Sequence, residues 1–277
     1  MLLKFGHMIQ GVSQPALDDF SHQVALETLK RYQPDMTLIH YTDVDTTRHN
    51  TGLDNDQVRA AMDRHDARLG ELFDTLKELG IYEETVIVIL GDHCQIGCSQ
   101  IVYLNYELMK RGYLTVSKRT NCVTDFQVYA SNCDGSCYIY VKDKQMEPEI
   151  GAMLQELAKK DQYGIETILT GEEAAALGAD PTCSYMIEAR TGYYYLDGHD
   201  RLTETVEEAK AHKMYATHGY LPSKPDYRTF FMAKGPGIRE KTVIEKMTLP
   251  DEGVTLAALL GFDLGAVDGK VISKMLL

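Results

Sequence analysis

A chain of 277 residues with 28 basic and 41 acidic side chains has a formal charge of −13 at neutral pH, which excludes a surface that attracts nucleic acid polymers or anionic membranes as a whole. Hydrophobic residues make up 44% of the chain and charged residues 25%, as in globular proteins with a core of useful size. No apolar run is long enough to cross a bilayer, and the N-terminal sequence MLLKFGHMIQG lacks the apolar region and cleavage site of a signal peptide.

The six cysteines predict a reducing compartment. A chain of this length does not need disulfides for stability, so we expect reduced thiols and a cytoplasmic protein. Two pairs of cysteines are each separated by three residues and would allow a structural zinc site, but thiols without metal are the simpler interpretation. The two pairs are Cys94/Cys98 and Cys133/Cys137.

The first part of the chain predicts alternating helices and strands. Apolar residues at helical spacing predict an amphipathic helix over Ala16–Tyr32, and DMTLIHY predicts a buried strand over Asp35–Tyr41. Asp54 or Asn55 would cap a long helix that runs to about Leu79.

The clearest strand is Thr85–Leu90, TVIVIL. Its continuous run of β-branched residues is typical of a parallel strand that is buried on both faces. It stops at Gly91, and Asp92 and His93 follow at once. The helix–strand–helix–strand order indicates an α/β fold. Ligands of such folds bind beyond the carboxyl ends of the strands, where the polar sequences TDVDTTRHN and DH both lie.

From about residue 112 the pattern changes to short strands around a helix near Glu147–Lys159. We interpret residues 112–199 as an inserted, cap-like α+β subdomain. The metal-binding α/β core would comprise residues 1–111 and 200–277 and would be incomplete at its N-terminus. A core strand, TFFMA, and a final helix over Pro250–Leu260 complete the core. The strands expected in the insertion are FQVYA, SCYIYV, GIETIL, CSYMIEA and GYYYL.

The first candidate pair of metal ligands is Asp45 and His49. They are four positions apart, so one turn of chain can aim both side chains at one ion. The spacing alone is weak evidence, because Asp18 and His22 share it inside a predicted helix, where we expect a solvated face.

Two further clusters carry candidate ligands. Asp92 and His93 lie at the end of the apolar strand, where a turn after Gly91 would let both side chains converge. The alternative is a capped loop in which His93 bonds to the backbone. His218 lies in THGY, before the TFFMA strand, and a lone loop histidine is usually no ligand.

Together the clusters supply ligands for two divalent metals. Asp45, His49 and His218 would hold one ion, and Asp92 and His93 the other. Imidazole with carboxylate suits zinc best, with manganese and iron as alternatives. Two such ions about 3.5–4 Å apart would clamp the attacking and leaving oxygens of a displacement at phosphorus.

The sequence here resembles the type I phosphodiesterase/nucleotide pyrophosphatase family of the alkaline phosphatase superfamily. The matching motifs, in order, are DTTRH (45–49), VIVILGDH (86–93) and THGY…FFMAKGPGI (217–238). The resemblance implies an alkaline-phosphatase-like, mostly parallel sheet flanked by helices. It also implies hydrolysis of phosphodiester or pyrophosphate bonds in a small substrate such as a nucleotide, through a covalent phospho-threonine or phospho-serine. Asp45, His49 and His218 would hold the metal that faces the phosphate, and Asp92 and His93 the metal that activates the nucleophile.

The chain departs from the family pattern in two places. Cys94 stands where the family usually has glycine after the Asp-His pair, which a small residue tolerates. More seriously, the family places another metal-binding aspartate and its nucleophile well before the D-x-x-x-H motif. Ser13 follows no apolar strand, and Asp18 and Asp19 lie in or beside a helix, so we identify no nucleophile. The chain is therefore expected to match the C-terminal two-thirds of the family.

Three functions stay open at this point. The first is a two-metal phosphodiesterase or pyrophosphatase that is truncated here. The second is a catalytically incomplete protein that binds a metal or a partner, which the missing nucleophile favours. The third is another superfamily activity, such as a phosphomonoesterase or a phosphosugar mutase; the chain lacks the sulfatase signature. A sheet that lacks a strand exposes unpaired edges, so self-association is also expected unless another polypeptide covers them.

Overall fold

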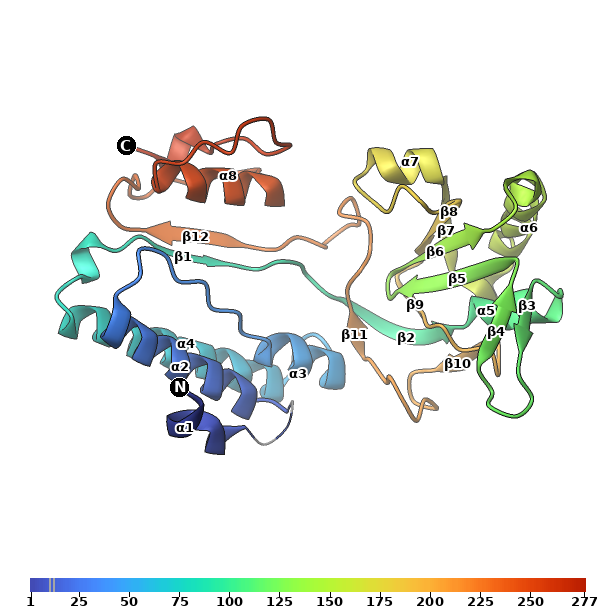
Figure 1. The fold of residues 1–277 in the computed structure, drawn as a ribbon, viewed down its shortest axis with the longest axis horizontal. Coiled ribbons are helices and arrows are strands. Elements are labelled where there is room, and N and C mark those ends of the chain that lie inside the picture. The colour runs from blue at the N-terminus through green and yellow to red at the C-terminus, as the bar shows by residue number, and fades with distance from the viewer. Residues whose placement is uncertain (10, 12) are drawn as a thin grey trace. The chain divides into compact units, whose positions relative to one another are not determined.

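The computed structural model describes residues 1–9, 11 and 13–277. These residues form two compact units, each built from separate stretches of the chain (Figure 1). The first unit comprises Met1–Tyr41, Asp63–Cys94 and Arg228–Leu277, and the second comprises Thr42–Met62 and Gln95–Tyr227.

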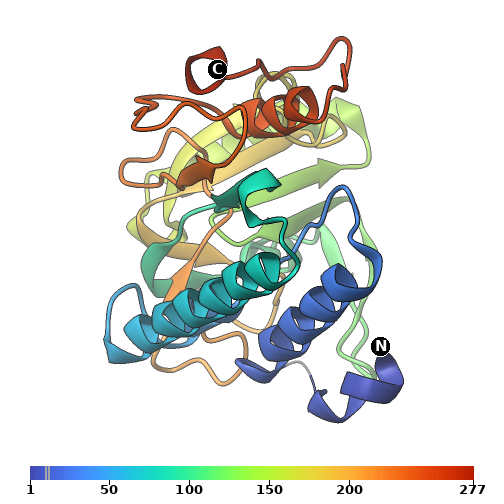
Figure 2. The same cartoon turned by 90° about the vertical axis from the view of Figure 1, so that its left-hand side faces the viewer.

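The two long helices confirm the sequence prediction. Helix α2 (Ala16–Tyr32) has the expected bounds, and α4 (Asp56–Glu78) begins after Asn55. The side chain of Asn55 accepts hydrogen bonds from the backbone N–H groups of Gln57 and Val58, as a helix cap does. The two helices run side by side (Figure 2). The other helical segments of the first unit are α1 (Leu2–Phe5), η1 (Gly6–Met8), η2 (Tyr82–Glu84), α8 (Leu249–Leu259) and η5 (Ser273–Met275).

The strands of the first unit differ from the prediction. Strand β1 (Ile87–Leu90) pairs with β12 (Phe231–Lys234), and the pairing is antiparallel. Residues 35–41 form no strand, and Leu38 in this segment is 80% exposed. The apolar sequence favours extended chain at both places, but a strand also needs a neighbour for its backbone hydrogen bonds. β1 finds that neighbour in β12, whereas residues 35–41 pair with none of the strands of the described residues.

The second unit contains the larger sheets. Strand β2 (Ile96–Val102) pairs antiparallel with β10 (Thr203–Thr205) and β11 (Ala216–Thr217), and parallel with β9 (Gly192–Tyr195). A separate four-stranded antiparallel sheet has the order β5–β6–β8–β7. Its strands are β5 (Val128–Cys133), β6 (Ser136–Val141), β7 (Ile165–Thr170) and β8 (Tyr185–Ala189).

Helices and a hairpin complete the second unit. The helix expected near residues 147–159 is α6 (Glu147–Ala158), and its buried face packs into the main apolar core beside the four-stranded sheet. The remaining elements are α3 (Asp43–Thr51), α5 (Leu104–Lys110), α7 (Gly171–Ala176), the 3-10 helices η3 (Lys144–Met146) and η4 (Asp161–Tyr163), and the hairpin of β3 (Leu114–Val116) with β4 (Val123–Phe126).

This mixture of helices and strands confirms the predicted α/β class. We expected a mostly parallel sheet. Among the described strands, however, β2–β9 is the one parallel pair, and the other pairs are antiparallel. Hydrophobic runs predict where strands form, but the partner and its direction are set by distant segments such as β12. The cap-like subdomain over residues 112–199 stays a prediction; its elements lie within the second unit.

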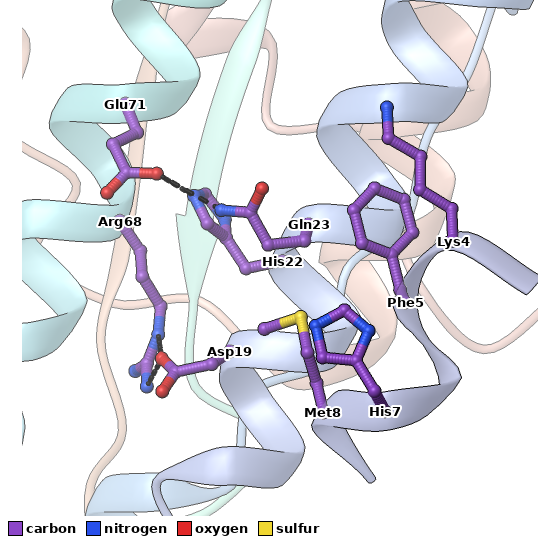
Figure 3. A pocket seen from close by; sticks show the side chains of 9 residues that line it. All are labelled: Lys4, Phe5, His7, Met8, Asp19, His22, Gln23, Arg68 and Glu71. Atoms are coloured by element: carbon purple, nitrogen blue, oxygen red, sulfur yellow. Dashed lines mark hydrogen bonds and ion pairs between the residues drawn. The ribbon is translucent and has the colours of Figure 1, made fainter. Parts of the chain in front are cut away.

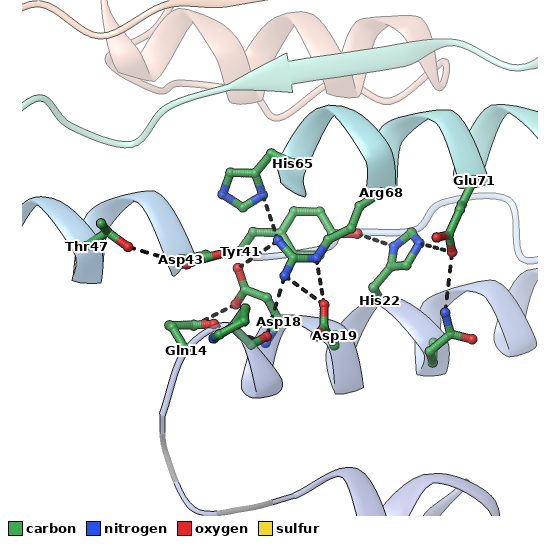
Figure 4. Close-up of polar contacts among 12 residues, drawn as sticks. Gln14, Asp18, Asp19, His22, Tyr41, Asp43, Thr47, His65, Arg68 and Glu71 are labelled. Atoms are coloured by element: carbon green, nitrogen blue, oxygen red, sulfur yellow. Dashed lines mark hydrogen bonds and ion pairs between the residues drawn. The ribbon is translucent and has the colours of Figure 1, made fainter. Parts of the chain in front are cut away.

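A buried polar cluster joins α2 to α4 in the first unit (Figures 3 and 4). Asp18 and His22 are only 1% and 2% exposed, so the solvated face expected for them is wrong. Their helix face turns toward α4, where the Arg68 guanidinium lies 3.9 Å from the Asp18 carboxylate. The His22 ring lies between the Tyr41 hydroxyl, at 2.7 Å, and the Glu71 carboxylate, at 3.2 Å. The pocket in Figure 3 borders this cluster.

Two further expectations concern the cysteines and membranes. No disulfide joins the cysteines, all of which lie in the described part of the chain. The four cysteines spaced in pairs do not come together as one zinc site in this part either. None of the described helices is both long and apolar enough to span a membrane.

Candidate metal centre

Helix α3 presents Asp45 and His49 on one face. The residues are four apart, which places their side chains one above the other on a helix. Asp45 lies in the first turn and His49 in the last, so each charge suits the partial charge at its end of the helix. The Oδ1 atom of Asp45 lies 3.3 Å from Nε2 of His49.

The tautomer of His49 follows from a backbone contact. Its Nδ1 lies 2.7 Å from the carbonyl oxygen of Ala216, and because a carbonyl can only accept, Nδ1 carries a proton and donates it. Nε2 then faces the Asp45 carboxylate either as a protonated donor or as a lone pair that requires a cation between them. Burial lowers the pKa of His49, but the hydrogen bond and charge of Asp45 and the Ala216 carbonyl outweigh it, so the net pKa is raised.

Gln95 supports Asp45 from the start of the β2 segment. Its side-chain amide donates to Asp45 Oδ1 at 2.7 Å and to the Asp45 backbone carbonyl at 3.2 Å. The Gln95 residue is 5% exposed, so both bonds lie away from solvent. One side chain therefore fixes both the backbone and the carboxylate of Asp45.

The tip of the β5–β6 hairpin supports His218. The backbone N–H of Gly135 donates to the carbonyl of His218 at 2.8 Å. The next residue, Gly219, has φ +79°, and a Cβ atom there would lie 1.9 Å from the carbonyl oxygen of Cys133. Only glycine fits this turn, and the close approach holds the His218 backbone against the hairpin.

The chain after His218 is tied down as well. The Tyr220 hydroxyl donates to the carbonyl of Tyr193 at 2.7 Å, and the backbone N–H of Leu221 donates to the Glu188 carboxylate. Lys224 pairs with Glu188 at 3.2 Å, and both side chains are nearly inaccessible, at 2% and 3% exposed. Burial raises the pKa of Glu188 in spite of this cation and the backbone donor.

The result is a convergent group of three ligands in the second unit. One ligand atom from each of Asp45, His49 and His218 lies within 4.8 Å of the others. The rings of His49 and His218 are 5.2 Å apart, centroid to centroid. Tetrahedral zinc with bonds of 2.0–2.1 Å needs ligand atoms about 3.4 Å apart, so small side-chain rotations suffice. Two imidazoles and one carboxylate fit zinc with a fourth position open to water.

Asp92 and His93 lie in the first unit. They follow β1, where Gly91 donates to the Phe230 carbonyl at 3.1 Å. Asp92 Oδ2 lies 3.6 Å from His93 Nε2, while His93 Nδ1 lies 3.1 Å from the Cys94 carbonyl. Here the metal and backbone interpretations of the sequence are compatible, because one ring nitrogen bonds to the backbone and the other faces the carboxylate.

The described residues before Asp45 contain the helices α1, η1 and α2 and the start of α3, but no strand. A nucleophile at a helix start that follows a strand is therefore not found among residues 1–9, 11 and 13–44.

Comparison with known proteins identifies the family. A family model for type I phosphodiesterase / nucleotide pyrophosphatase matches residues 4–221. The chain belongs to this family. A search of the curated proteins finds no match.

Solved structures of family members are similar in fold. Murine ectonucleotide pyrophosphatase/phosphodiesterase 5 superposes with a TM-score of 0.69 at 18% identity, over 94% of this chain and 64% of that one. An inactive variant of the murine protein in complex with AMP gives 0.67 at 18% identity, over 91% and 61% of the chains. The human protein gives 0.66 at 19% identity, over 91% and 61%. The chain thus spans under two-thirds of the length of these relatives, and the likeness supports the α/β, alkaline-phosphatase-like fold.

The sequence analysis missed the groups that support the ligands. Gln95 lies two residues after the Asp-His pair, but no spacing links it to Asp45. Gly135 lies in a hairpin turn that carries no catalytic motif. Their roles depend on contacts between segments far apart in the chain, so one sequence holds no signal for them.

Proposed function

We propose that this chain is a metal-dependent hydrolase of phosphodiester or pyrophosphate bonds in small substrates such as nucleotides. The observation that carries the proposal is the convergence of Asp45, His49 and His218 in the second unit. Family membership adds the reaction class. The AMP bound to a murine relative adds the substrate class.

The donor chemistry supports zinc as the metal, and the proposal includes two ions. Asp45, His49 and His218 would hold one ion, and Asp92 and His93 would contribute to the other. When bound, these ions supply Lewis acidity toward a phosphoryl oxygen and lower the pKa of water or a hydroxyl group.

Neighbouring residues hold the side chains of Asp45, His49 and His218 in place. Donation from His49 Nδ1 to the Ala216 carbonyl keeps Nε2 directed at the Asp45 carboxylate. The Gln95 amide holds Asp45, and the hairpin tip at Gly135 holds the His218 backbone. These supports lower the entropy lost when the ligands are ordered, which favours a preformed site over an induced one.

A second candidate is a metal- or partner-binding protein without turnover. Other superfamily activities, on phosphomonoesters or phosphosugars, would use the same metal ligands. The proposal includes a cytoplasmic location, which is inferred from the cysteines. The proposed hydrolysis does not depend on this location.

The test combines metal analysis with substrate comparison. Metal content is measured by elemental mass spectrometry after zinc and manganese are offered, for the wild type, Asp45→Ala and His218→Ala. The control is His199→Ala, since His199 lies outside the ligand group. Hydrolysis of bis(4-nitrophenyl) phosphate and of 4-nitrophenyl phosphate is measured in parallel.

Metal-dependent diester turnover that His218→Ala abolishes and His199→Ala keeps would support the hydrolase. Bound metal without turnover would favour the second candidate, and preference for the monoester would favour another superfamily activity. Metal content unchanged by both Asp45→Ala and His218→Ala would refute the proposed centre.

A further inference from the structure

The short strand β11 (Ala216–Thr217) contacts one candidate metal ligand and leads directly into another. The carbonyl oxygen of Ala216 orients the first of them, because it accepts the proton of His49 Nδ1 at 2.7 Å. The second, His218, follows Thr217 in the chain. A shift of β11 would therefore disturb the support of both imidazoles at once.

A carboxylate from the tip of the β5–β6 hairpin holds the side chain of Thr217. Thr217 is fully buried, at 0% exposed, and its hydroxyl donates to Oδ2 of Asp134 at 3.1 Å. The sulfur atom of Met214 also lies near this hydroxyl, at 3.7 Å, but a thioether accepts only weakly. A hydrogen bond to a charged acceptor is stronger than one between neutral groups, so Asp134 is the principal partner of Thr217.

The backbone of the hairpin tip holds Asp134 in turn. The carbonyl of Asp134 accepts a hydrogen bond of 2.8 Å from the backbone N–H of Tyr195, which is 1% exposed. Asp134 has φ +55°, in the left-handed region that aspartate and asparagine enter more readily than most side chains. The next residue, Gly135, donates to the carbonyl of His218. The tip thus contacts Thr217 through a side chain and His218 through the backbone.

The charge of Asp134 also acts on the ligand group. Burial lowers the pKa of His49, and the neighbouring Asp45 carboxylate and a backbone hydrogen bond raise it. Asp134 acts in the same direction as Asp45. A carboxylate at this place also favours a divalent cation among the ligands, because unlike charges attract over such distances in a partly buried site.

We propose that Asp134 is a positioning residue of the candidate metal centre and acts through Thr217. By this one contact it supports both imidazoles, because Thr217 lies between the carbonyl that orients His49 and the ligand His218. Without the contact, the buried hydroxyl loses its charged acceptor, and β11 can shift to find another. The inference rests on the proposed function and deepens it, since it names a residue outside the ligand group that sets the metal affinity.

The experiment measures zinc affinity by competitive titration and the visible spectrum of bound Co²⁺, which reports ligand geometry independently of activity. Asp134→Gly removes the carboxylate and suits the left-handed backbone, whereas Asp134→Asn keeps an acceptor oxygen. Thr217→Val removes the donor at a similar size, and Thr217→Ser keeps it. The controls are Thr167→Val and Asp125→Ala, which change exposed residues of β7 and β4 in the same unit.

We expect Asp134→Gly and Thr217→Val each to weaken zinc binding about 10–100-fold, the range for the loss of an outer partner of a metal ligand, and to shift the Co²⁺ spectrum. Asp134→Asn and Thr217→Ser should stay closer to the wild type, and both controls should match it. The double variant Asp134→Gly/Thr217→Val should bind zinc no more weakly than the weaker single variant, because both changes remove the same contact. The melting temperature of the metal-free protein verifies that each variant folds.

Wild-type zinc affinity and an unchanged Co²⁺ spectrum in a folded Asp134→Gly variant, while Asp45→Ala abolishes binding, would overturn the role of Asp134 and leave the proposed hydrolase intact. Losses that add in the double variant would also overturn it, since they would show that the two residues do not act through one contact. No metal bound by the wild type would refute the proposed function together with this inference.

Discussion

Replacement of Gln95 by methionine tests whether the metal centre is preorganised. Methionine has a similar length and volume but no donors, so it removes both hydrogen bonds to Asp45 without opening a large cavity. Because Gln95 is 5% exposed, water does not readily replace the lost donor. We expect the variant to fold and to bind zinc more weakly.

The size of the effect follows from the two bonds. A hydrogen bond to a charged group contributes about 1.5–3 kcal/mol, and Gln95 makes one such bond to the Asp45 carboxylate at 2.7 Å. Outer partners of metal ligands affect metal affinity by about 10–100-fold, which corresponds to about 1.4–2.7 kcal/mol. Both estimates place the loss in zinc affinity at one to two orders of magnitude.

The assay is a competitive zinc titration with a chromophoric chelator, together with a thermal melt of the metal-free protein. Gln100→Met is the matched control, because it makes the same change on the same strand, β2. A zinc dissociation constant that Gln95→Met leaves unchanged, while Asp45→Ala abolishes binding, would refute the claim that Gln95 positions Asp45.

Three further predictions concern stability and the His218 loop. Lys224→Met should cost about 3–5 kcal/mol of unfolding free energy, because it leaves the Glu188 carboxylate buried without its cation; chemical denaturation measures the cost. Gly219→Ala should weaken zinc binding by more than about tenfold in the same titration, since the new methyl group meets the Cys133 carbonyl. Burial lowers the pKa of His22 from the ordinary 6.5, so the unfolding free energy should fall as pH decreases from 6.5 through the folded-state pKa, as urea titrations at several pH values would show.

Each of these has a contrary outcome. Glu188→Gln added to Lys224→Met should recover part of the stability, and no recovery would mean that the buried charge is not the cause. Wild-type zinc affinity in a folded Gly219→Ala variant would show that the hairpin contact does not position His218. A pH dependence that His22→Gln leaves unchanged would assign it to other groups.

Local sequence signals predicted the helices well. The bounds of α2 were predicted in full, because its apolar spacing is regular along its whole length, and the start of α4 follows from the capping side chain of Asn55. The strands of the four-stranded antiparallel sheet were also predicted to within a few residues; SCYIYV, for example, is β6.

The pairing of strands and the residues that support the metal ligands were not predictable from the same signals. Residues 35–41 have the composition of a buried strand, yet they pair with no strand of the described chain. For the metal centre, the sequence supplied Asp45, His49 and His218, which the structure brings together. It did not supply Gln95, because Gln95 acts through hydrogen bonds to Asp45, 50 positions away in the chain, and a single sequence contains no record of such contacts.

The hairpin tip at Gly135 has a consequence for how this family can be diversified. The segment predicted to be cap-like, residues 112–199, also contacts the backbone of the candidate metal ligand His218, through the Gly135–His218 bond and the fit of Gly219 against Cys133. An exchange of residues 112–199 between relatives would then alter metal affinity. Chimeras would have to retain the turn around Gly135 and the glycine after His218, so shape can diverge only in the parts of this segment that lie away from that turn.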